Sequence, residues 1–175
     1  MAIVNVWYPK LRSAKDVYND PKGGGGVYTL VDNVGHASLT LNKSKKKSYV
    51  SWWPDKTHTS FATPSYNEDI KLEGDKPSTR TEIDFLDEDI IAAWWDRVRI
   101  DGRAYPWKTD FLPADNKWTL ERNNCSHLVW LALKVGGAEK HASLMRWGAE
   151  LVTPPQIHIY AERLKASRRI NSLFR

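Results

Sequence analysis

Hydrophobic and polar residues alternate with the two-residue period of a β-strand in four short segments of the N-terminal half. This alternation predicts strands over residues 3–8, 27–32, 35–41 and 48–53. The polar stretch 42–47 suits a hairpin connection between the last two strands. Residues 54–80 are polar, contain Pro64 and Pro77 and show little periodicity, so we expect a long loop, which in compact domains is often functional.

The C-terminal half has helical signals instead. We expect a helix over 87–99, with acidic residues at its start and arginines at its end, as the helix dipole favours. A second helix over 125–135 ends at a glycine pair, and a short one is expected over 142–149. A last helix begins with Thr153 as N-cap and Gln156 completing a capping box, and runs to about residue 166. The expected fold class is therefore α+β.

Length and composition favour one soluble domain. The chain has 175 residues, of which 27% are charged and 41% hydrophobic, which is typical of a globular protein with a real core. A single cysteine excludes an internal disulfide and a multi-cysteine zinc site, and we expect no metal and no cofactor. We find no secretory signal peptide and no membrane-spanning run, so synthesis in the cytoplasm is expected, with a dedicated export machine if the protein acts elsewhere.

The chain is basic, with a net charge of +5 and a pI of about 9.3. Part of the excess lies in a lysine cluster, which comprises Lys43, Lys45, Lys46 and Lys47. A solvated surface, an anionic membrane and an acidic cell wall are the open interpretations. Nucleic acid is excluded as the favoured partner because no known nucleic-acid-binding signature is present.

Cys125 is the first candidate for chemistry. It begins a helix that Asn123 or Asn124 can cap. A thiol in the first helical turn is stabilised as a thiolate by unpaired N–H groups and by the helix dipole. Its own backbone N–H has no intrahelical partner and can face a developing oxyanion. A buried, inert cysteine is the alternative for this residue taken alone.

His36 is the candidate general base. It opens the strand 35–41, on the face shared by Ser38 and Thr40, whereas Ala37 and its apolar partners take the opposite face. We expect Gly35 to leave room for a substrate. Of the other histidines, His127 lies about 200° around the helix from Cys125 and points away from the thiol. The remaining three are His58, which lies in the long loop and could approach the site, and His141 and His158, in or beside the C-terminal helices.

These segments resemble a known group of enzymes. Residues 124–129, Asn-Cys-Ser-His-Leu-Val, are similar to the Asn-Cys-Glu-His-Phe-Val motif of the lecithin:retinol acyltransferase family and its phospholipase relatives. Residues 35–39 and 49–54 resemble that family's histidine strand and the strand after it. Histidine before cysteine is the order of the permuted NlpC-type papain-like enzymes, and the combination also resembles antibacterial toxins delivered by type VI secretion. The resemblance spans about residues 27–166 of one catalytic domain, 1–175.

The resemblance implies a permuted papain-like fold with a small antiparallel sheet against the cysteine helix. It also implies a site made of Cys125, His36 and Ser51, with Asn124, Gly35 and Trp52 near the substrate or the oxyanion. Ser51 stands where the family has a second histidine, and Ser126 where it has glutamate. Ser51 is a weak orienting group for an imidazole, so His58 or Asp55 remain alternatives for the third member.

The implied function is a cysteine-dependent acyl hydrolase, with a phospholipase-like antibacterial toxin as the favoured activity. The alternatives are a peptidoglycan amidase or endopeptidase, a protease or transferase acting on a cytoplasmic protein, and a non-catalytic envelope-binding module. The expected partners are a phospholipid membrane or peptidoglycan as substrate, an immunity protein and a secretion machinery. The oligomeric state stays open.

Overall fold

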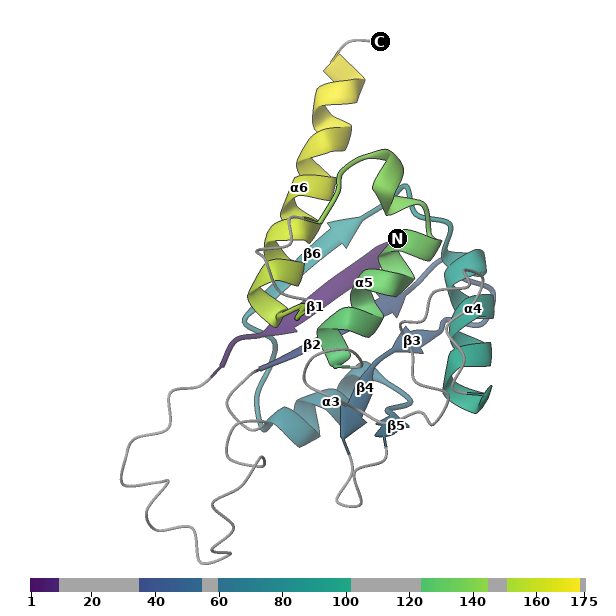
Figure 1. The fold of residues 1–175 in the computed structure, drawn as a ribbon, viewed down its shortest axis with the longest axis vertical. Helices are drawn as coiled ribbons and strands as arrows, with labels where there is room; N and C mark the ends of the chain where they lie inside the picture. Colours follow the sequence, from purple (N-terminus) through teal and green to yellow (C-terminus); the bar gives the residue numbers. More distant parts are fainter. Residues whose placement is uncertain (10–34, 55–59, 102–123, 145–150, 174–175) are drawn as a thin grey trace, which may run out of the picture.

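The computed structural model of the chain describes residues 1–9, 35–54, 60–101, 124–144 and 151–173. Its centre is a four-stranded sheet with the strand order β3-β2-β1-β6, in which every neighbouring pair is antiparallel (Figure 1). The strands are β1 (Ala2–Trp7), β2 (His36–Leu41), β3 (Tyr49–Val50) and β6 (Thr79–Ile83), and β4 (Trp52–Pro54) pairs separately with β5 (Ser60–Ala62). The helices are α3 (Tyr66–Glu73), α4 (Glu88–Asp101), α5 (Cys125–Val135), the short 3-10 helix η1 (Ala138–Lys140) and α6 (Pro154–Leu173). The described part is therefore α+β, as the sequence predicts.

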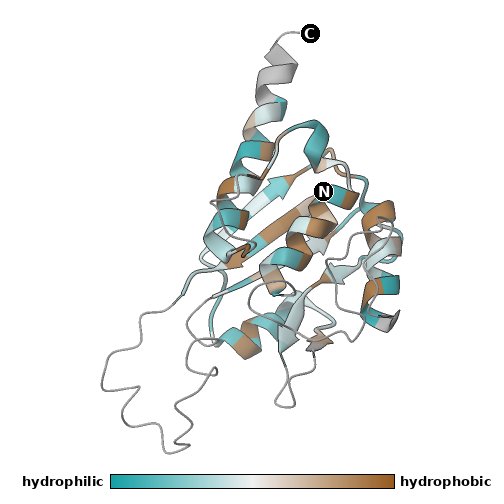
Figure 2. Ribbon diagram, in the orientation of Figure 1, coloured by the Kyte–Doolittle hydropathy of each residue, from teal (hydrophilic) through white to brown (hydrophobic). Residues whose placement is uncertain are grey.

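One face of the sheet is apolar and carries the core. The pairing register places Val4 opposite Leu39, and both side chains are buried against the helices. Helices α5 and α6 lie over this face, and α4 packs beside α5 (Figure 1). Figure 2 shows the apolar residues concentrated where α5 meets the central strands. The small antiparallel sheet thus carries the cysteine helix directly on its surface.

The opposite face of the sheet is polar. Asn5 of β1 donates from its side-chain amide to Ser38 Oγ at 3.2 Å and to Thr40 Oγ1 at 3.1 Å. Arg80 of β6 donates in turn to Asn5 Oδ1 at 3.2 Å. His36 and Trp7 stand opposite each other on this same face, at one end of the strands. The period of two thus separates core residues from the residues that build the site.

Most predicted elements of regular structure are confirmed. Strands β1 and β2 correspond to the predicted 3–8 and 35–41, and helices α4 and α5 to 87–99 and 125–135. Asn124 caps α5 by accepting from the backbone N–H of His127 at 2.8 Å. Gln156 Oε1 accepts from the backbone N–H of Thr153 at 2.8 Å, which is one half of a capping box. Helix α6 continues to Leu173, beyond the predicted end.

The long loop predicted over 54–80 is wrong. Its described part contains β5, α3 and the start of β6. Ser65 caps α3 by accepting from the backbone N–H of Glu68, and Gly74 ends the helix with φ of 72°. The predicted strand 48–53 is divided at Ser51 into β3 and β4. The expected helix 142–149 is not helical over 142–144. Several other expectations fall outside the described residues, namely the strand 27–32, part of the helix 142–149, Asp55 and His58.

Among the described residues, no helix combines the length and apolar composition that crossing a bilayer requires.

Candidate active site

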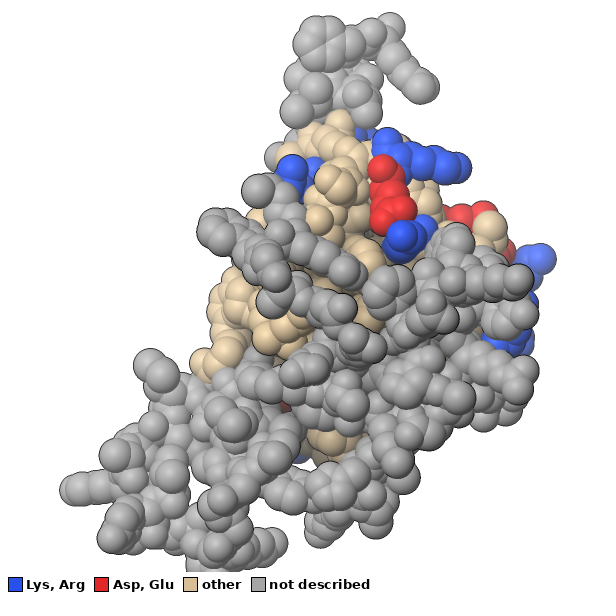
Figure 3. Space-filling model, viewed as in Figure 1, with Lys and Arg blue, Asp and Glu red and all other residues tan. Residues whose placement is uncertain are grey.

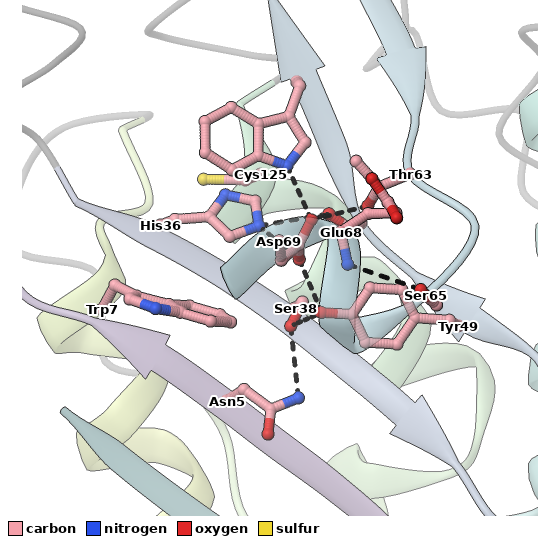
Figure 4. A network of polar contacts seen from close by, with 12 residues as sticks. Asn5, Trp7, His36, Ser38, Tyr49, Thr63, Ser65, Glu68, Asp69 and Cys125 are labelled. Carbon is pink, nitrogen blue, oxygen red and sulfur yellow. Dashed lines mark hydrogen bonds and ion pairs between the residues drawn. The ribbon is translucent and has the colours of Figure 1, made fainter. Parts of the chain in front are cut away.

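Cys125 occupies the first turn of α5, next to the start of β2. Its side chain is buried, and the backbone N–H of Ala37 favours the thiolate form of the side chain. The His36 side chain interacts electrostatically with it, and Figure 4 shows the sulfur beside the His36 ring. The predicted pair of thiol and imidazole is therefore brought together, with the sulfur at a helix start that favours a thiolate.

His36 is held between two indole rings. Trp53 stacks on the imidazole with ring centroids 4.3 Å apart and an interplanar angle of 27°. Trp7 lies on a second side, with centroids 5.3 Å apart. The imidazole is only 2% exposed, so packing fixes its orientation. Such fixed positioning is what a general base needs at the moment of proton transfer.

Asp69 of α3 is the partner of the imidazole on its far side. Its Oδ2 lies 2.9 Å from His36 Nε2, and the carboxylate is fully buried. Because Nε2 faces Asp69, the other ring nitrogen, Nδ1, is left for the thiol (Figure 4). Cys125, His36 and Asp69 thus have the arrangement in which a nucleophile, a base and an orienting carboxylate can act together.

Four further side chains donate to the Asp69 carboxylate. Ser51 Oγ, Trp53 Nε1 and Thr63 Oγ1 reach Oδ1 at 2.9, 2.9 and 2.6 Å. Tyr49 donates its hydroxyl proton to Oδ2 at 2.5 Å. A buried charge is tolerated only when hydrogen bonds replace its lost hydration, and these donors do so. The site therefore presents a fixed carboxylate rather than a mobile one.

Tyr49 connects this carboxylate to the polar face of the sheet. Its oxygen lies 2.7 Å from Ser38 Oγ, and a hydroxyl carries one proton. Since Tyr49 gives its proton to Asp69, Ser38 donates to Tyr49, and Asn5 donates to Ser38. Burial and the charge of Asp69 raise the pKa of Tyr49 well above its usual value, so it remains a donor.

Charge within the triad is coupled. Burial opposes ionisation of the Cys125 thiol. The positive His36 ring and the hydrogen-bonding groups of His36 and Ala37 outweigh this effect of burial, so the pKa of Cys125 is lowered. Burial likewise opposes the imidazolium, but the Cys125 thiolate and Asp69 raise the pKa of His36 to about 10. Burial would raise the pKa of Asp69, yet hydrogen bonds from His36, Thr63 and Tyr49 lower it to about 2. The arrangement therefore favours a thiolate, an imidazolium and a carboxylate together.

Ser51 also reaches the site, in a supporting position. Its Oγ lies 3.1 Å from His36 Nε2 and donates to Asp69. Having given its proton to the carboxylate, the hydroxyl can only accept from the imidazole N–H. The structure thus places Ser51 beside a charged orienting group, which is Asp69.

The residues expected near the substrate have other contacts. The side chain of Asn124 is used as the cap of α5. Gly35 adopts φ of 73°, and a Cβ atom there would lie 2.2 Å from the carbonyl oxygen of Trp7, so the glycine serves backbone geometry. Trp52 points into the core and packs edge-on against Trp95 with centroids 5.9 Å apart. Trp52 therefore does not face His36.

The site residues that the sequence interpretation does not include are Trp7, Tyr49, Trp53, Thr63 and Asp69. Partial sequence signals exist for Trp53 and Asp69. Adjacent strand residues face opposite ways, so a Ser51 in the site implies that Tyr49 and Trp53 share its side and that Trp52 does not. For Asp69, the Ser65-x-x-Glu68 capping box followed by Gly74 predicts the helix α3. No local signal marks Asp69 as buried.

Three of the other histidines lie away from the thiol. His127 is buried and stacks on Trp130, with centroids 5.4 Å apart. His141 packs against Phe85, with centroids 3.9 Å apart, and His158 of α6 is hydrogen-bonded to the hydroxyl of Tyr8. In the described ranges, no group of three or more His, Cys, Asp or Glu side chains is arranged to hold a metal ion.

Comparison of the chain with protein-family models finds no match. Comparisons with curated proteins and with solved structures likewise find no significant match. The functional interpretation therefore depends on the residues and the geometry described above.

Proposed function

We propose that this protein is a permuted papain-like cysteine hydrolase that cleaves acyl esters of phospholipids. The single observation that carries the proposal is the buried line of Cys125, His36 and Asp69. A merely structural cysteine requires neither an imidazole beside its sulfur nor a carboxylate behind that imidazole. The order of the three residues along the chain, histidine before cysteine, supports the permuted arrangement.

The reaction begins with attack of the Cys125 thiolate on the acyl carbonyl carbon. The backbone N–H of Cys125, at the start of α5, stabilises the oxyanion of the tetrahedral intermediate. The His36 imidazolium gives its proton to the leaving alcohol as the carbon–oxygen bond breaks, which leaves a thioester on Cys125. Neutral His36 then takes a proton from water, whose oxygen attacks the thioester and releases the carboxylic acid. Asp69 holds the ring in position through both steps.

An aromatic surface beside the base favours an apolar acyl group. Phe61 of β5 stands directly opposite Trp53 in the β4–β5 pair, and its side chain is 40% exposed. Cross-strand neighbours share a face, so Phe61 lies on the same face of the β4–β5 pair as the indole that stacks on His36. An exposed apolar surface next to reacting groups suits a fatty acyl chain.

The decisive experiment offers several substrates to one preparation. Purified protein is incubated separately with phospholipid vesicles and with peptidoglycan sacculi, and products are identified by mass spectrometry. We expect free fatty acid and lysophospholipid from the vesicles, and none with the Cys125→Ala variant. Release of peptidoglycan fragments with intact lipid would contradict the lipid substrate and retain the cysteine mechanism. If the Cys125→Ala variant keeps the toxicity of the wild type, the enzymatic interpretation is rejected.

A further inference from the structure

A cavity of about 350 Å³ lies beside the Asp69 cluster, between the lysine cluster, α4 and the segment that follows β5. Its volume is in the range of about 300–1,000 Å³ that small-molecule sites occupy. Lys46, Lys47 and Arg99 line it, together with Trp95 and the hydroxyl-bearing residues Tyr49 and Thr63. The cavity thus combines cationic side chains with an aromatic wall and two hydroxyl-bearing residues.

The cations of the cavity outnumber its carboxylates. Asp96, the one acidic residue among the described lining residues, pairs with Lys46 Nζ at 2.6 Å and with Arg99 Nη2 at 2.8 Å. Lys47 pairs with no carboxylate among the described residues. Three positive groups against one negative group leave the lining cationic, and the ammonium group of Lys47 remains able to donate to an anion.

The other two lysines of the cluster serve a different purpose. The backbone N–H of Lys43 donates to Glu88 Oε2 at 2.6 Å, and that of Lys45 donates to Asp89 Oδ1 at 3.0 Å. These two bonds fix the loop on the start of α4, and neither residue lines the cavity. Figure 3 shows cationic and acidic side chains next to one another on the described part of its face, so the surface there is not of a single sign.

The walls of the cavity belong partly to the candidate active site. The hydroxyl groups of Tyr49 and Thr63 donate to opposite oxygens of Asp69 at 2.5 and 2.6 Å. A ligand in the cavity therefore lies behind the carboxylate that holds His36, and away from the thiol. Its charge acts on the triad through Asp69 and its donors.

We propose that this cavity binds the phosphate group of a small phosphoester, and that binding alters the reactivity of Cys125 through Tyr49, Thr63 and Asp69. Phosphate is a strong acceptor that matches the ammonium and guanidinium donors. A cavity of this volume also has room for the organic part of the ester against Trp95. The same phosphate chemistry is available from a soluble phosphoester or from a phospholipid headgroup.

Binding is tested by calorimetry with inorganic phosphate and with glycerol 3-phosphate, and glycerol serves as the neutral control. Phosphatidylglycerol vesicles in a co-sedimentation assay represent the lipid source. We expect the Lys46→Gln/Lys47→Gln variant to bind about tenfold more weakly. The Lys43→Gln/Lys45→Gln variant is the matched control, because it removes the same charge from the same loop outside the cavity.

Binding of soluble phosphates by the wild type assigns the site to soluble phosphoesters, and cavity-dependent binding of vesicles alone assigns it to headgroups. If none of the probes binds, the proposal is overturned. Equal weakening in the two double variants also overturns it, because the effect is then one of general surface charge.

The effect of a ligand in the cavity on the reactivity of Cys125 is measured separately, by a method that does not depend on hydrolysis. The rate of Cys125 alkylation by iodoacetamide is measured against pH with and without saturating glycerol 3-phosphate. Added negative charge behind Asp69 disfavours the thiolate, so the midpoint of the alkylation–pH profile is expected to move to higher pH in the wild type. In the Lys46→Gln/Lys47→Gln variant the midpoint is expected to stay in place. An unchanged midpoint in the ligand-bound wild type overturns the coupling.

Discussion

Asp69 Oδ2 and His36 Nε2 lie 2.9 Å apart, although 33 residues separate them in the chain. The contact joins the first residue of β2 to the middle of α3, and both side chains are buried. It fixes which ring nitrogen faces the thiol, and it gives the imidazolium a permanent counter-charge.

The Cys125→Ala and His36→Ala variants are each expected to lose hydrolysis while keeping the fold. Residues that act as one unit are non-additive, so the double variant is expected to be hardly worse than either single one. Turnover of a phospholipid substrate is measured for all three, with circular dichroism as the check on folding. His141→Ala is the matched histidine control, since His141 packs against Phe85 away from the thiol. Strong activity in folded Cys125→Ala protein would refute the mechanism.

Asp69→Asn is expected to reduce kcat by about two to four orders of magnitude. An amide is nearly isosteric with the carboxylate but lacks its charge, so it stabilises the imidazolium less. Its NH2 group also meets donors that require an acceptor. The pH profile of Cys125 alkylation is measured alongside kcat, and its midpoint is expected to rise as the imidazolium loses its counter-charge. A variant with lower stability but an unchanged midpoint would mean that Asp69 serves folding alone.

Ser51→Ala is expected to reduce activity by about one to two orders of magnitude, less than any triad substitution. The variant removes one donor to Asp69 and one acceptor for His36, while Thr63, Trp53 and Tyr49 still hold the carboxylate. Steady-state kinetics of Ser51→Ala and Asp69→Asn are compared under the same conditions. A larger loss in Ser51→Ala than in Asp69→Asn would show that the hydroxyl, and not the carboxylate, orients the imidazole.

Hydrolysis is expected to need the Cys125 thiolate together with the His36 imidazolium. The pH range of the activity therefore follows from the pKa values of these two side chains. The lowered pKa of Cys125 keeps the thiolate present below its ordinary titration range, and the rate falls on the acid side when the thiolate is protonated. The rate falls on the alkaline side as pH rises through about 10, where His36 loses its proton.

The ion pair of Cys125 and His36 also contributes to the stability of the folded state. Because the pKa of His36 is raised, its stabilising contribution is complete below the ordinary histidine value of about 6.5 and is lost as pH rises through about 10. In Cys125→Ala the thiolate is absent, so His36 is expected to titrate at lower pH. NMR titration of the His36 ring in both proteins measures the difference. Identical titration curves would mean that Cys125 and His36 do not interact electrostatically.

Gly35→Ala is expected to destabilise the fold by more than about 2 kcal/mol. The new Cβ would lie 2.2 Å from the Trp7 carbonyl oxygen, in a backbone conformation with φ of 73°. Gly74→Ala is the matched control, because Gly74 has φ of 72° but a Cβ atom added there would have no neighbouring atom within 4 Å. The control is expected to cost only about 1–2 kcal/mol, which is the strain of the conformation itself. Denaturant unfolding measures both, and equal losses would contradict the clash.

The residues of the site whose position depends only on their neighbours in the sequence could be predicted. Cys125 at a capped helix start and His36 at a strand start each follow from the few residues around them. The sequence interpretation names Ser51, which lies beside His36, and Trp52, whereas Trp53 is the residue that stacks on the ring. Strand alternation through Tyr49 and Ser51 contains enough information to choose Trp53.

Asp69 was not predictable in the same way. Its neighbours in α3, including Glu68, are partly or fully exposed. An aspartate in such a polar segment is typical of a solvated helix face. Its burial depends on donors from three other segments, which include Tyr49 of β3 and Thr63 after β5. Only the three-dimensional arrangement brings these donors to one carboxylate. The same is true of the cavity lined by Lys46 and Arg99, which belong to a loop and a helix far apart in the chain.

The dual role of Trp53, which stacks on His36 and donates to Asp69, links reactivity to the order of folding. The β4–β5 pair, α3 and α5 must all dock on β2 before the imidazolium has its carboxylate and the thiol has its imidazolium. Contacts between segments so distant in sequence form late in folding, because loop closure opposes them until the core is in place. We therefore expect a newly made chain to hold an ordinary, weakly nucleophilic thiol until its last tertiary contacts form. During refolding, the rate of Cys125 alkylation at neutral pH is therefore expected to rise only after the sheet has formed, so that it reports completion of the native state.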